Sequence, residues 1–381
     1  MYVIFPELPN FRIVYMYVCM YNVCIKRLGM LWAGIPLLEQ YNFRWINDTD
    51  FIMLALKAVI LVTALYLMYA ESAVVVRDDV INHRPIIGIL SQEQSKYFHT
   101  KYPENYTSYI AASYVKNVEA SGARVVPIMI GRDRDYYRDL MSKINGVLFP
   151  GGATYFNQSD GYADAGEHIY HVAMELNDAG SYFPVIGTCL GFELLIILAS
   201  GRGKVENREK CYSFKNSRLN FTKDFRKSKM YRDAPEYVVD ILSTDDVTAN
   251  AHQFCILDSN LEKYSLKNDW LITSHSMDED GLAFVASVEH KRYPFYGVQF
   301  HPEKVAFEWK ASKHYPHSFK AVQANRYFMD FFVEECRRSG HKFPSHSEEN
   351  RHLIYNYKPE FTGLLGSSYE QCYFFEPRGT V

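Results

Sequence analysis

Apolar and amphipathic segments alternate along the chain between Arg84 and Gly201. Short apolar runs bounded by polar residues predict strands, and apolar residues spaced three or four apart predict helices. The predicted strands are 85–90, 124–130, 146–152 and 183–189, and the predicted helices are 107–121, 134–144, 164–179 and 190–200. Strands that alternate with helices predict an α/β fold with a mostly parallel central sheet and helices on both faces. In such a sheet, functional side chains gather at the carboxyl ends of the strands.

The pattern changes after Gly203. Residues 204–232 are polar and irregular. Residues 270–290 predict a hairpin, because two apolar runs flank an Asp-Gly pair, and residues 293–303 contain a further strand. Residues 318–340 predict a long amphipathic helix with one apolar side, formed by Tyr327, Phe328, Phe331 and Phe332.

These elements predict one domain at residues 82–345, without an internal linker, and a C-terminal tail at 346–381. Residues 53–72 carry an uncharged apolar run and then small residues at the spacing of a cleavage site, so they predict a secretory signal peptide. The run is short for a membrane span, and a signal anchor is the alternative. We treat residues 1–52, which lack a clear period, as an N-terminal extension, with Met53 as the expected natural start.

Sequons and cysteines also point to export. Three N-x-[ST] sequons that follow the predicted signal are expected to be glycosylated, at Asn105, Asn157 and Asn220. Five cysteines follow the signal as well, and an odd number in an exported protein leaves at least one thiol unpaired. Cys189 is the expected free thiol, and the pairing of the other four stays open. The net charge of −3 predicts no bulk affinity for nucleic acid and, with the short apolar run, no stable membrane insertion.

Cys189 stands between Gly187 and Gly191, at the junction of a predicted strand and a predicted helix. This G-x-C-x-G pattern has the form of a nucleophile elbow, in which a strained turn presents one side chain at the edge of the sheet. The helix dipole at that position favours an anion, so we expect it to lower the pKa of the thiol. The alternative is a buried cysteine that only fills space.

A thiol nucleophile needs a base, an orienting group and an oxyanion hole. His301 and Glu303 are two residues apart, so on an extended segment they point to the same side. The backbone N–H of Leu190 is one candidate oxyanion donor. The "FPGG" segment supplies the other from Gly151 or Gly152, where no Cβ obstructs a substrate carbonyl.

Together these motifs resemble the class I glutamine amidotransferases. The segments "RPIIGIL", "YIAASYVKNVEASGARVVP", "INGVLFPGG", "FPVIGTCLGFE", "TANAHQF" and "YGVQFHPEKVAFEW" resemble the gamma-glutamyl hydrolase family more closely. The resemblance extends from about Arg84 to Cys372. Glu193 stands where amidotransferases usually carry glutamine, which favours the hydrolase branch.

The resemblance implies an amidotransferase-like fold and hydrolysis of γ-glutamyl bonds in poly-γ-glutamylated folates and antifolates. It makes 82–345 the catalytic domain, with Cys189 as nucleophile, His301 as acid and base, and Glu303 as third member. His252 matches a second active-site histidine of the family. The family implies no metal or organic cofactor, a homodimer, and a secreted, lysosomal or vacuolar location.

Two other functions are compatible with these motifs. A glutaminase that supplies ammonia to a synthetase is the nearest alternative, and a catalytically silent binding protein is the next. Residues 204–232 carry ten basic and three acidic side chains, so we consider that this segment borders the cleft and attracts a polyanionic tail, or is only a solvated surface. His168 and His171 lie three apart on a predicted helix with Glu175 one turn on, which is a weak signal for a metal site.

Overall fold

The computed structural model describes residues 81–102, 106–202 and 207–376. The N-terminal extension, the predicted signal peptide and the sequon at Asn105 therefore lie outside the described residues. Asn157 and Asn220 are described, and both are exposed. No helix within the described residues is long and apolar enough to cross a membrane.

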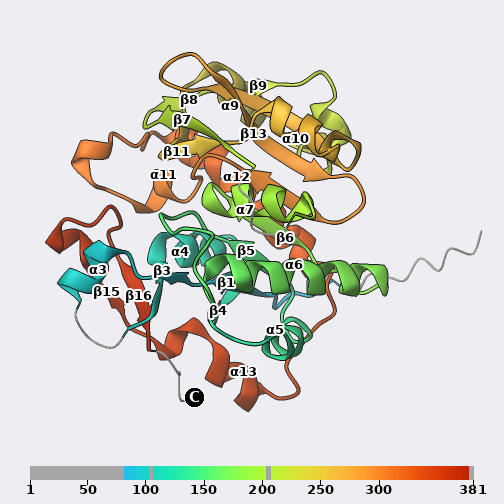
Figure 1. Cartoon of the computed structure of the whole chain (residues 1–381), viewed down its shortest axis with the longest axis vertical. Coiled ribbons are helices and arrows are strands. Elements are labelled where there is room, and N and C mark those ends of the chain that lie inside the picture. Colours follow the sequence, from blue (N-terminus) through green and yellow to red (C-terminus); the bar gives the residue numbers. More distant parts are fainter. Residues whose placement is uncertain (1–80, 103–105, 203–206, 377–381) are drawn as a thin grey trace, which may run out of the picture. The chain divides into compact units, whose positions relative to one another are not determined.

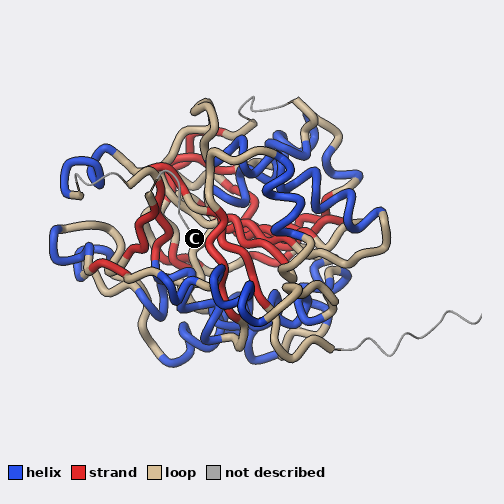
Figure 2. The backbone as a smooth tube through the Cα atoms, turned by 90° about the horizontal axis from the view of Figure 1, so that it is seen from below, coloured by secondary structure: helices blue, strands red, loops and turns tan. Residues whose placement is uncertain are grey.

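An eight-stranded sheet forms the centre of the described chain (Figures 1 and 2). Its first five strands run parallel, in the order β4 (Arg124–Ile128), β1 (Ile86–Leu90), β5 (Gly146–Phe149), β6 (Val185–Thr188) and β14 (Phe295–Val298). Three antiparallel strands continue it, β13 (Ala283–His290), β12 (Trp270–Met277) and β9 (Asn220–Phe221). The predicted mostly parallel sheet is confirmed, and so is the hairpin at 270–290.

The sheet is buried on both faces, which explains why its strands are continuous apolar runs. Along β1, Ile87 and Ile89 join one apolar core, whereas Ile86 and Leu90 join the other. This alternation follows from the two-residue period of a strand. One face packs against α5 (Arg134–Met141), α6 (Tyr162–Asp178) and α7 (Leu190–Ala199). The other packs against α4 (Ala112–Ala120), α9 (Glu236–Thr244) and α12 (Phe319–Arg337).

The predicted start of the first helix is wrong. Residues Ser108–Ala111 form the strand β3, and α4 begins only at Ala112, without a side-chain cap. β3 lies in a second, four-stranded antiparallel sheet with β2 (Gln92–Glu93), β16 (Cys372–Phe375) and β15 (Pro359–Glu360). Pairing with a distant strand has overridden the local helical periodicity.

The segment that we expected to be a tail packs into the same compact unit as the predicted domain. α13 (His346–His352) follows α12, and β16 pairs with β3 across more than half of the sequence. Cys372, Phe374 and Phe375 of β16 are buried. The short connections add α3 (Lys96–Lys101), α8 (Lys229–Arg232), α10 (Asp258–Lys263) and α11 (Lys304–Phe307).

Two small antiparallel sheets each take one strand from the segment 204–232, which was predicted to be irregular, and one from residues 248–255. β7 (Glu209–Ser213) pairs with β11 (His252–Cys255), and β8 (Asn216–Ser217) pairs with β10 (Thr248–Ala249). A disulfide between Cys211 and Cys255 links β7 to β11. Cys189, Cys336 and Cys372 are free, so the prediction that Cys189 is a free thiol is confirmed.

Candidate active site

Cys189 occupies a sharp turn between β6 and α7. Its backbone has φ +51° and ψ −112°, in the left-handed half of conformational space, which is costly for a residue with a side chain. The Cys189 N–H donates to Val298 O of β14 at 2.7 Å, and Cys189 O accepts from the Glu193 N–H at 2.9 Å. The turn is therefore held by the neighbouring strand on one side and by the first turn of α7 on the other.

The two flanking glycines are required by close packing. A Cβ added to Gly187 would lie 2.5 Å from Gly191 O, and a Cβ added to Gly191 would lie 2.0 Å from Phe149 O. Both contacts are with backbone atoms, which cannot move aside as a flexible side chain could. The geometry matches the elbow that the G-x-C-x-G pattern predicts.

His301 follows β14, and its imidazole is fixed from two sides. Its Nδ1 lies 2.7 Å from Glu303 Oε1 and 3.2 Å from the Tyr114 hydroxyl. The His301 backbone N–H donates to Ala249 O at 2.9 Å. His301 and Glu303 are both buried, so the pairing that their two-residue spacing predicts is present in a low-dielectric environment.

Cys189 and His301 meet at Gly151, which follows β5. A Cβ added to Gly151 would lie 2.6 Å from His301 Cε1 and 3.0 Å from Cys189 Cβ. Three residues from three separate loops thus converge at the carboxyl ends of adjacent parallel strands, where the topology predicts a site. Nδ1 of His301 is occupied by Glu303, which leaves Nε2 as the ring nitrogen for proton exchange.

The structure separates the two candidate glycine donors. The Gly151 N–H donates to the Tyr114 hydroxyl at 2.8 Å, so it is already used, whereas Gly152 lines the adjacent cavity. Gln92 holds this loop, because its side-chain amide donates to Pro150 O at 3.0 Å and to Gly151 O at 3.1 Å. The Leu190 N–H lies against the sulfur of Cys189 and lowers the pKa of the thiol.

The net effect of the surroundings on the Cys189 thiol is opposite to that expected from the helix dipole alone. Burial raises its pKa, the carboxylates of Glu193 and Glu303 raise it further, and the Leu190 N–H and the Lys304 charge only partly oppose this. Burial also lowers the pKa of His301 below its usual range, although the Glu303 carboxylate acts in the opposite direction. The thiol and the imidazole are therefore both neutral at rest.

A buried polar group behind Cys189 was not found by sequence reasoning. Glu193 Oε1 accepts from Gln299 Nε2 at 3.0 Å, and Glu193 Oε2 pairs with Arg208 Nη1 at 2.6 Å. The same Gln299 amide lies 3.8 Å from Cys189 Sγ. The Arg208 guanidinium is stacked between Phe156 and Phe254, 4.7 and 4.2 Å from their ring centres. The arginine compensates the Glu193 charge, which would otherwise be too costly to bury.

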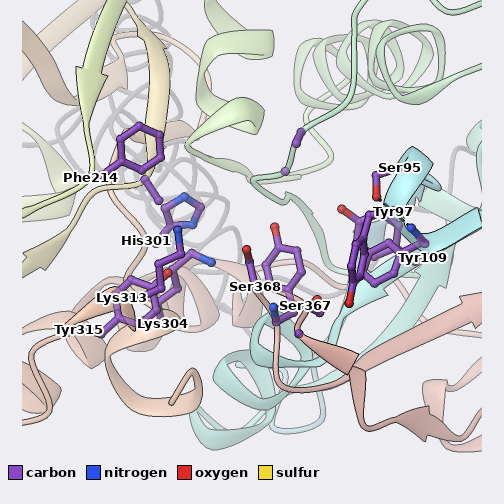
Figure 3. Close-up of a pocket in the computed structure, with 16 residues that line it drawn as sticks. Ser95, Tyr97, Tyr109, Phe214, His301, Lys304, Lys313, Tyr315, Ser367 and Ser368 are labelled. Carbon is purple, nitrogen blue, oxygen red and sulfur yellow. Dashed lines mark hydrogen bonds between the residues drawn. The ribbon is translucent and has the colours of Figure 1, made fainter. Parts of the chain in front are cut away.

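A cavity of about 270 Å³ opens beside His301 (Figure 3). Among the described residues, its charged lining side chains are Lys304 and Lys313, and no carboxylate lines it. Lys304 is buried, and its ammonium lies 4.5 Å from the ring centre of Tyr369. Although burial lowers it, the pKa of Lys304 is raised by Tyr315, Glu303 and Glu308, so the group is charged. The charged side chains that line the cavity are therefore cationic, which favours an anionic ligand. Cys189 is only 3% exposed and does not itself line the cavity.

His252 lies on β11, buried against Phe284 with ring centres 5.0 Å apart. Its Nε2 is 3.3 Å from Asn250 Oδ1. Burial lowers its pKa to about 4, and the neighbouring His301 acts in the same direction. His252 is thus a buried, neutral side chain whose pKa is affected by the nearby His301, and not a solvated loop residue.

Two secondary predictions are not supported by the arrangement of side chains. In the segment 204–232, the Arg226 guanidinium donates to Tyr231 O and Ala234 O, and Lys227 forms an ion pair with Asp224. These side chains therefore bind groups that are close in the sequence. Lys223, Arg226 and Lys227 do not line the cavity, although Phe214 of the same segment does, so attraction of a polyanionic tail by these basic side chains stays a prediction. His168 and His171 pack against Tyr137 and Tyr170. No cluster of three or more potential metal ligands occurs among the described residues.

Comparison with known proteins agrees with the geometry. The family model described as Peptidase C26 matches residues 85–303. A human protein named gamma-glutamyl hydrolase is 38% identical over 294 residues, which cover 77% of this chain and 90% of the human one. Gamma-glutamyl hydrolase B of Dictyostelium discoideum is 36% identical, with 77% and 84% covered, and gamma-glutamyl hydrolase 1 of Arabidopsis thaliana is 35% identical, with 79% and 86% covered. With its cysteine elbow and paired histidine inside the matched region, the chain belongs to the peptidase C26 family.

Proposed function

We propose that this chain is a cysteine peptidase that hydrolyses γ-glutamyl bonds in poly-γ-glutamylated small molecules, folates and antifolates among them. The observation that carries the proposal is the convergence of Cys189 and His301 at Gly151, beside a cavity whose charged lining groups are cationic. A poly-γ-glutamyl tail carries one α-carboxylate per unit, so its charge complements this lining. The similarity to proteins named gamma-glutamyl hydrolases supports the same substrate class.

The first half of the reaction forms a thioester. The Cys189 sulfur attacks the γ-carbonyl carbon, and its proton passes to Nε2 of His301. The negative charge that develops on the carbonyl oxygen is stabilised by the N–H groups of Leu190 and Gly152. Glu303 holds the imidazole in one tautomer and stabilises the imidazolium that forms. Because Cys189 is nearly buried, side chains at the floor of the cavity must shift as the substrate enters.

The first half is completed when the imidazolium of His301 protonates the leaving amine as the C–N bond breaks, which releases the first product and leaves the thioester. The second half hydrolyses this thioester. Water then adds to the thioester carbonyl, with the neutral imidazole taking one of its protons. The thiol leaves, takes that proton back, and the product carries a new γ-carboxyl group. No oxidant, metal or further reactant is consumed in this sequence.

The decisive test is incubation of the purified protein with a penta-γ-glutamyl folate and analysis of the products. We expect shortened folates with release of glutamate or short γ-glutamyl peptides. Cys189→Ser should reduce the rate by at least about 10³-fold. Cys336→Ala, which removes a buried free thiol on α12, is the matched control and should retain activity. Release of ammonia from free glutamine with no cleavage of the folate would favour a glutaminase instead.

We also infer that the protein is secreted or resides in a lysosome or vacuole. The exposure of Asn157 and Asn220 and the Cys211–Cys255 disulfide are consistent with an oxidising, glycosylating route. A mobility shift after glycosidase treatment, together with N-terminal sequencing of the exported product, tests this. A homodimer is expected as well, and sedimentation of the purified protein tests it.

A further inference from the structure

One side of the cavity combines an aromatic ring with an ammonium group. Phe214 follows β7, and Lys313 ends a short 3-10 turn, Ala311–Lys313, after α11. The Lys313 ammonium lies 5.7 Å from the centre of the Phe214 ring, at a distance typical of a cation–π contact. Figure 3 shows Phe214, Lys313, Lys304 and Tyr315 on the side of His301, with Ser95, Tyr97 and Tyr109 on the other.

The segments that carry Phe214 and Lys313 are joined by a hydrogen bond. The Asn216 side-chain amide, two residues after Phe214, donates to His314 O at 2.8 Å, directly after Lys313. The Phe214 N–H donates to Glu279 Oε1 at 3.0 Å, which holds the backbone at Phe214. Lys310 Nζ donates to Gly366 O at 2.7 Å and holds the 3-10 turn beside Gly366, which also lines the cavity. The backbone at Lys313 is therefore held beside that of Phe214 by the fold.

Phe214 and Lys313 make few contacts that would stabilise the fold. Phe214 is 47% exposed although it lines a cavity. Lys313 is half-buried, and within the described residues the contact found for its ammonium is the Phe214 ring, without an ion pair to a carboxylate. A lysine that is positioned by an aromatic ring, faces a cavity and lacks an internal counter-ion is suited to bind the anionic group of a ligand.

We propose that Lys313, positioned over Phe214, is a specificity-determining residue that binds the α-carboxylate of one glutamyl unit of the substrate tail. The Phe214 ring orients the ammonium and offers an apolar wall to the methylene groups of that unit. Lys304 is buried and lines the cavity together with His301, three residues before it, so we assign it to the unit at the scissile bond. Lys313 serves a neighbouring unit. This inference rests on the proposed function.

The test compares γ-glutamyl tails in which one unit at a time carries an α-carboxamide in place of the α-carboxylate. With the all-carboxylate tail, Lys313→Ala should lower kcat/KM about tenfold through KM, with kcat nearly unchanged. With the tail that is amidated at the contacted unit, wild type and Lys313→Ala should be equal. Lys313→Arg should retain most of the affinity, and Phe214→Leu, which keeps bulk but removes the π face, should raise KM moderately.

Lys227→Ala is the matched control, because it removes a lysine of the basic segment that does not line the cavity. It should leave KM unchanged for every tail. The inference is overturned if Lys313→Ala lowers kcat/KM equally for every tail, amidated or not, or if kcat falls while KM stays constant. Wild-type protein that cleaves none of these tails would instead overturn the proposed function and, with it, this inference. Binding of the all-carboxylate tail to Cys189→Ser with and without Lys313→Ala gives a second readout that needs no turnover.

Discussion

At the scale of single residues, burial acts on Cys189 and His301 in opposite directions. It raises the pKa of the thiol and lowers the pKa of the imidazole, because in both cases it disfavours the charged form. The resting pair is therefore neutral, and the proton moves only when the sulfur attacks. An imidazole that stays neutral at mildly acidic pH remains a competent base there. We expect the acid limb of kcat/KM to lie below the usual histidine range.

Glu303→Gln tests how the Glu303 carboxylate affects the pKa of His301. The Glu303 carboxylate is ionised, because the facing His301 and their hydrogen bond hold its pKa below its usual range in spite of burial. Its charge raises the pKa of His301, so removing the charge should move the acid limb of kcat/KM to lower pH. The maximal rate should fall by about 10² to 10⁴, since the imidazolium and its tautomer lose their partner.

The measurement is a full pH–rate profile for both proteins. Glu289→Gln is the control, because Glu289 is a buried carboxylate that binds the backbone of Lys229 and Met230 and does not contact the site. Its acid limb should coincide with that of the wild type. An acid limb of Glu303→Gln that is unchanged, or that lies at higher pH, would contradict the assigned role of Glu303.

At the scale of elements, the junction of β6 and α7 depends on the absence of a single carbon atom. Gly191→Ala would place a Cβ 2.0 Å from the backbone oxygen of Phe149 on β5. We expect a loss of roughly 3 kcal/mol or more in the free energy of unfolding, or failure to fold, because a helix must move off the sheet. Gly180→Ala is the control: its Cβ meets nothing within 4 Å, so only the cost of its positive φ of +79° remains.

Chemical denaturation of both variants measures the difference. Gly180→Ala should lose only about 1–2 kcal/mol. If Gly191→Ala loses no more than Gly180→Ala, close packing is not the reason for a glycine at 191.

The disulfide between β7 and β11 is a second element-scale feature. It closes a loop between residues 44 apart and holds β11, which carries His252, beside β7, which begins directly after Arg208. Replacing both Cys211 and Cys255 by alanine should lower the free energy of unfolding by about 2–4 kcal/mol. Thermal unfolding with and without reductant checks this, since reductant should weaken the wild type but leave the double variant unchanged. A double variant as stable as the oxidised wild type would contradict it.

The sequence predicted the elements whose signal is local. The G-x-C-x-G pattern and the two-residue spacing of His301 and Glu303 are short-range patterns, and both led to the correct geometry. β3 and β16 were missed, because their strand character comes from pairing with each other across more than 250 residues and not from their own periodicity. The role of the basic side chains in 204–232 could not be predicted for a related reason. A count of charges does not say which of these side chains bind nearby backbone groups and which face a cavity. Lys304 and Lys313 carried no signal in the sequence until the fold brought them to one cavity.

At the scale of the whole molecule, two buried histidines couple stability to pH. Burial lowers the pKa of His252 to about 4 and that of His290 to about 4. In the unfolded chain each titrates near 6.5, so between about pH 6.5 and pH 4 the unfolded state binds more protons than the folded state. Stability should therefore be fully present above pH 6.5 and fall as the pH is lowered toward 4, by up to about 3 kcal/mol for each histidine.

His290→Asn isolates one of these contributions. His290 Nδ1 accepts the N–H groups of Arg292 and Tyr293 at 3.1 and 3.0 Å, and the side-chain oxygen of asparagine can accept both without ever becoming charged. The variant loses the ring contact with Trp270, so its stability at pH 7 should be somewhat lower. Its loss of stability between pH 7 and pH 4.5 should nevertheless be smaller than that of the wild type. His83→Asn, at an exposed position, should follow the wild type throughout. Denaturant unfolding at a series of pH values decides: a His290→Asn curve that falls as steeply as the wild-type curve would mean that the acid sensitivity of the fold arises elsewhere.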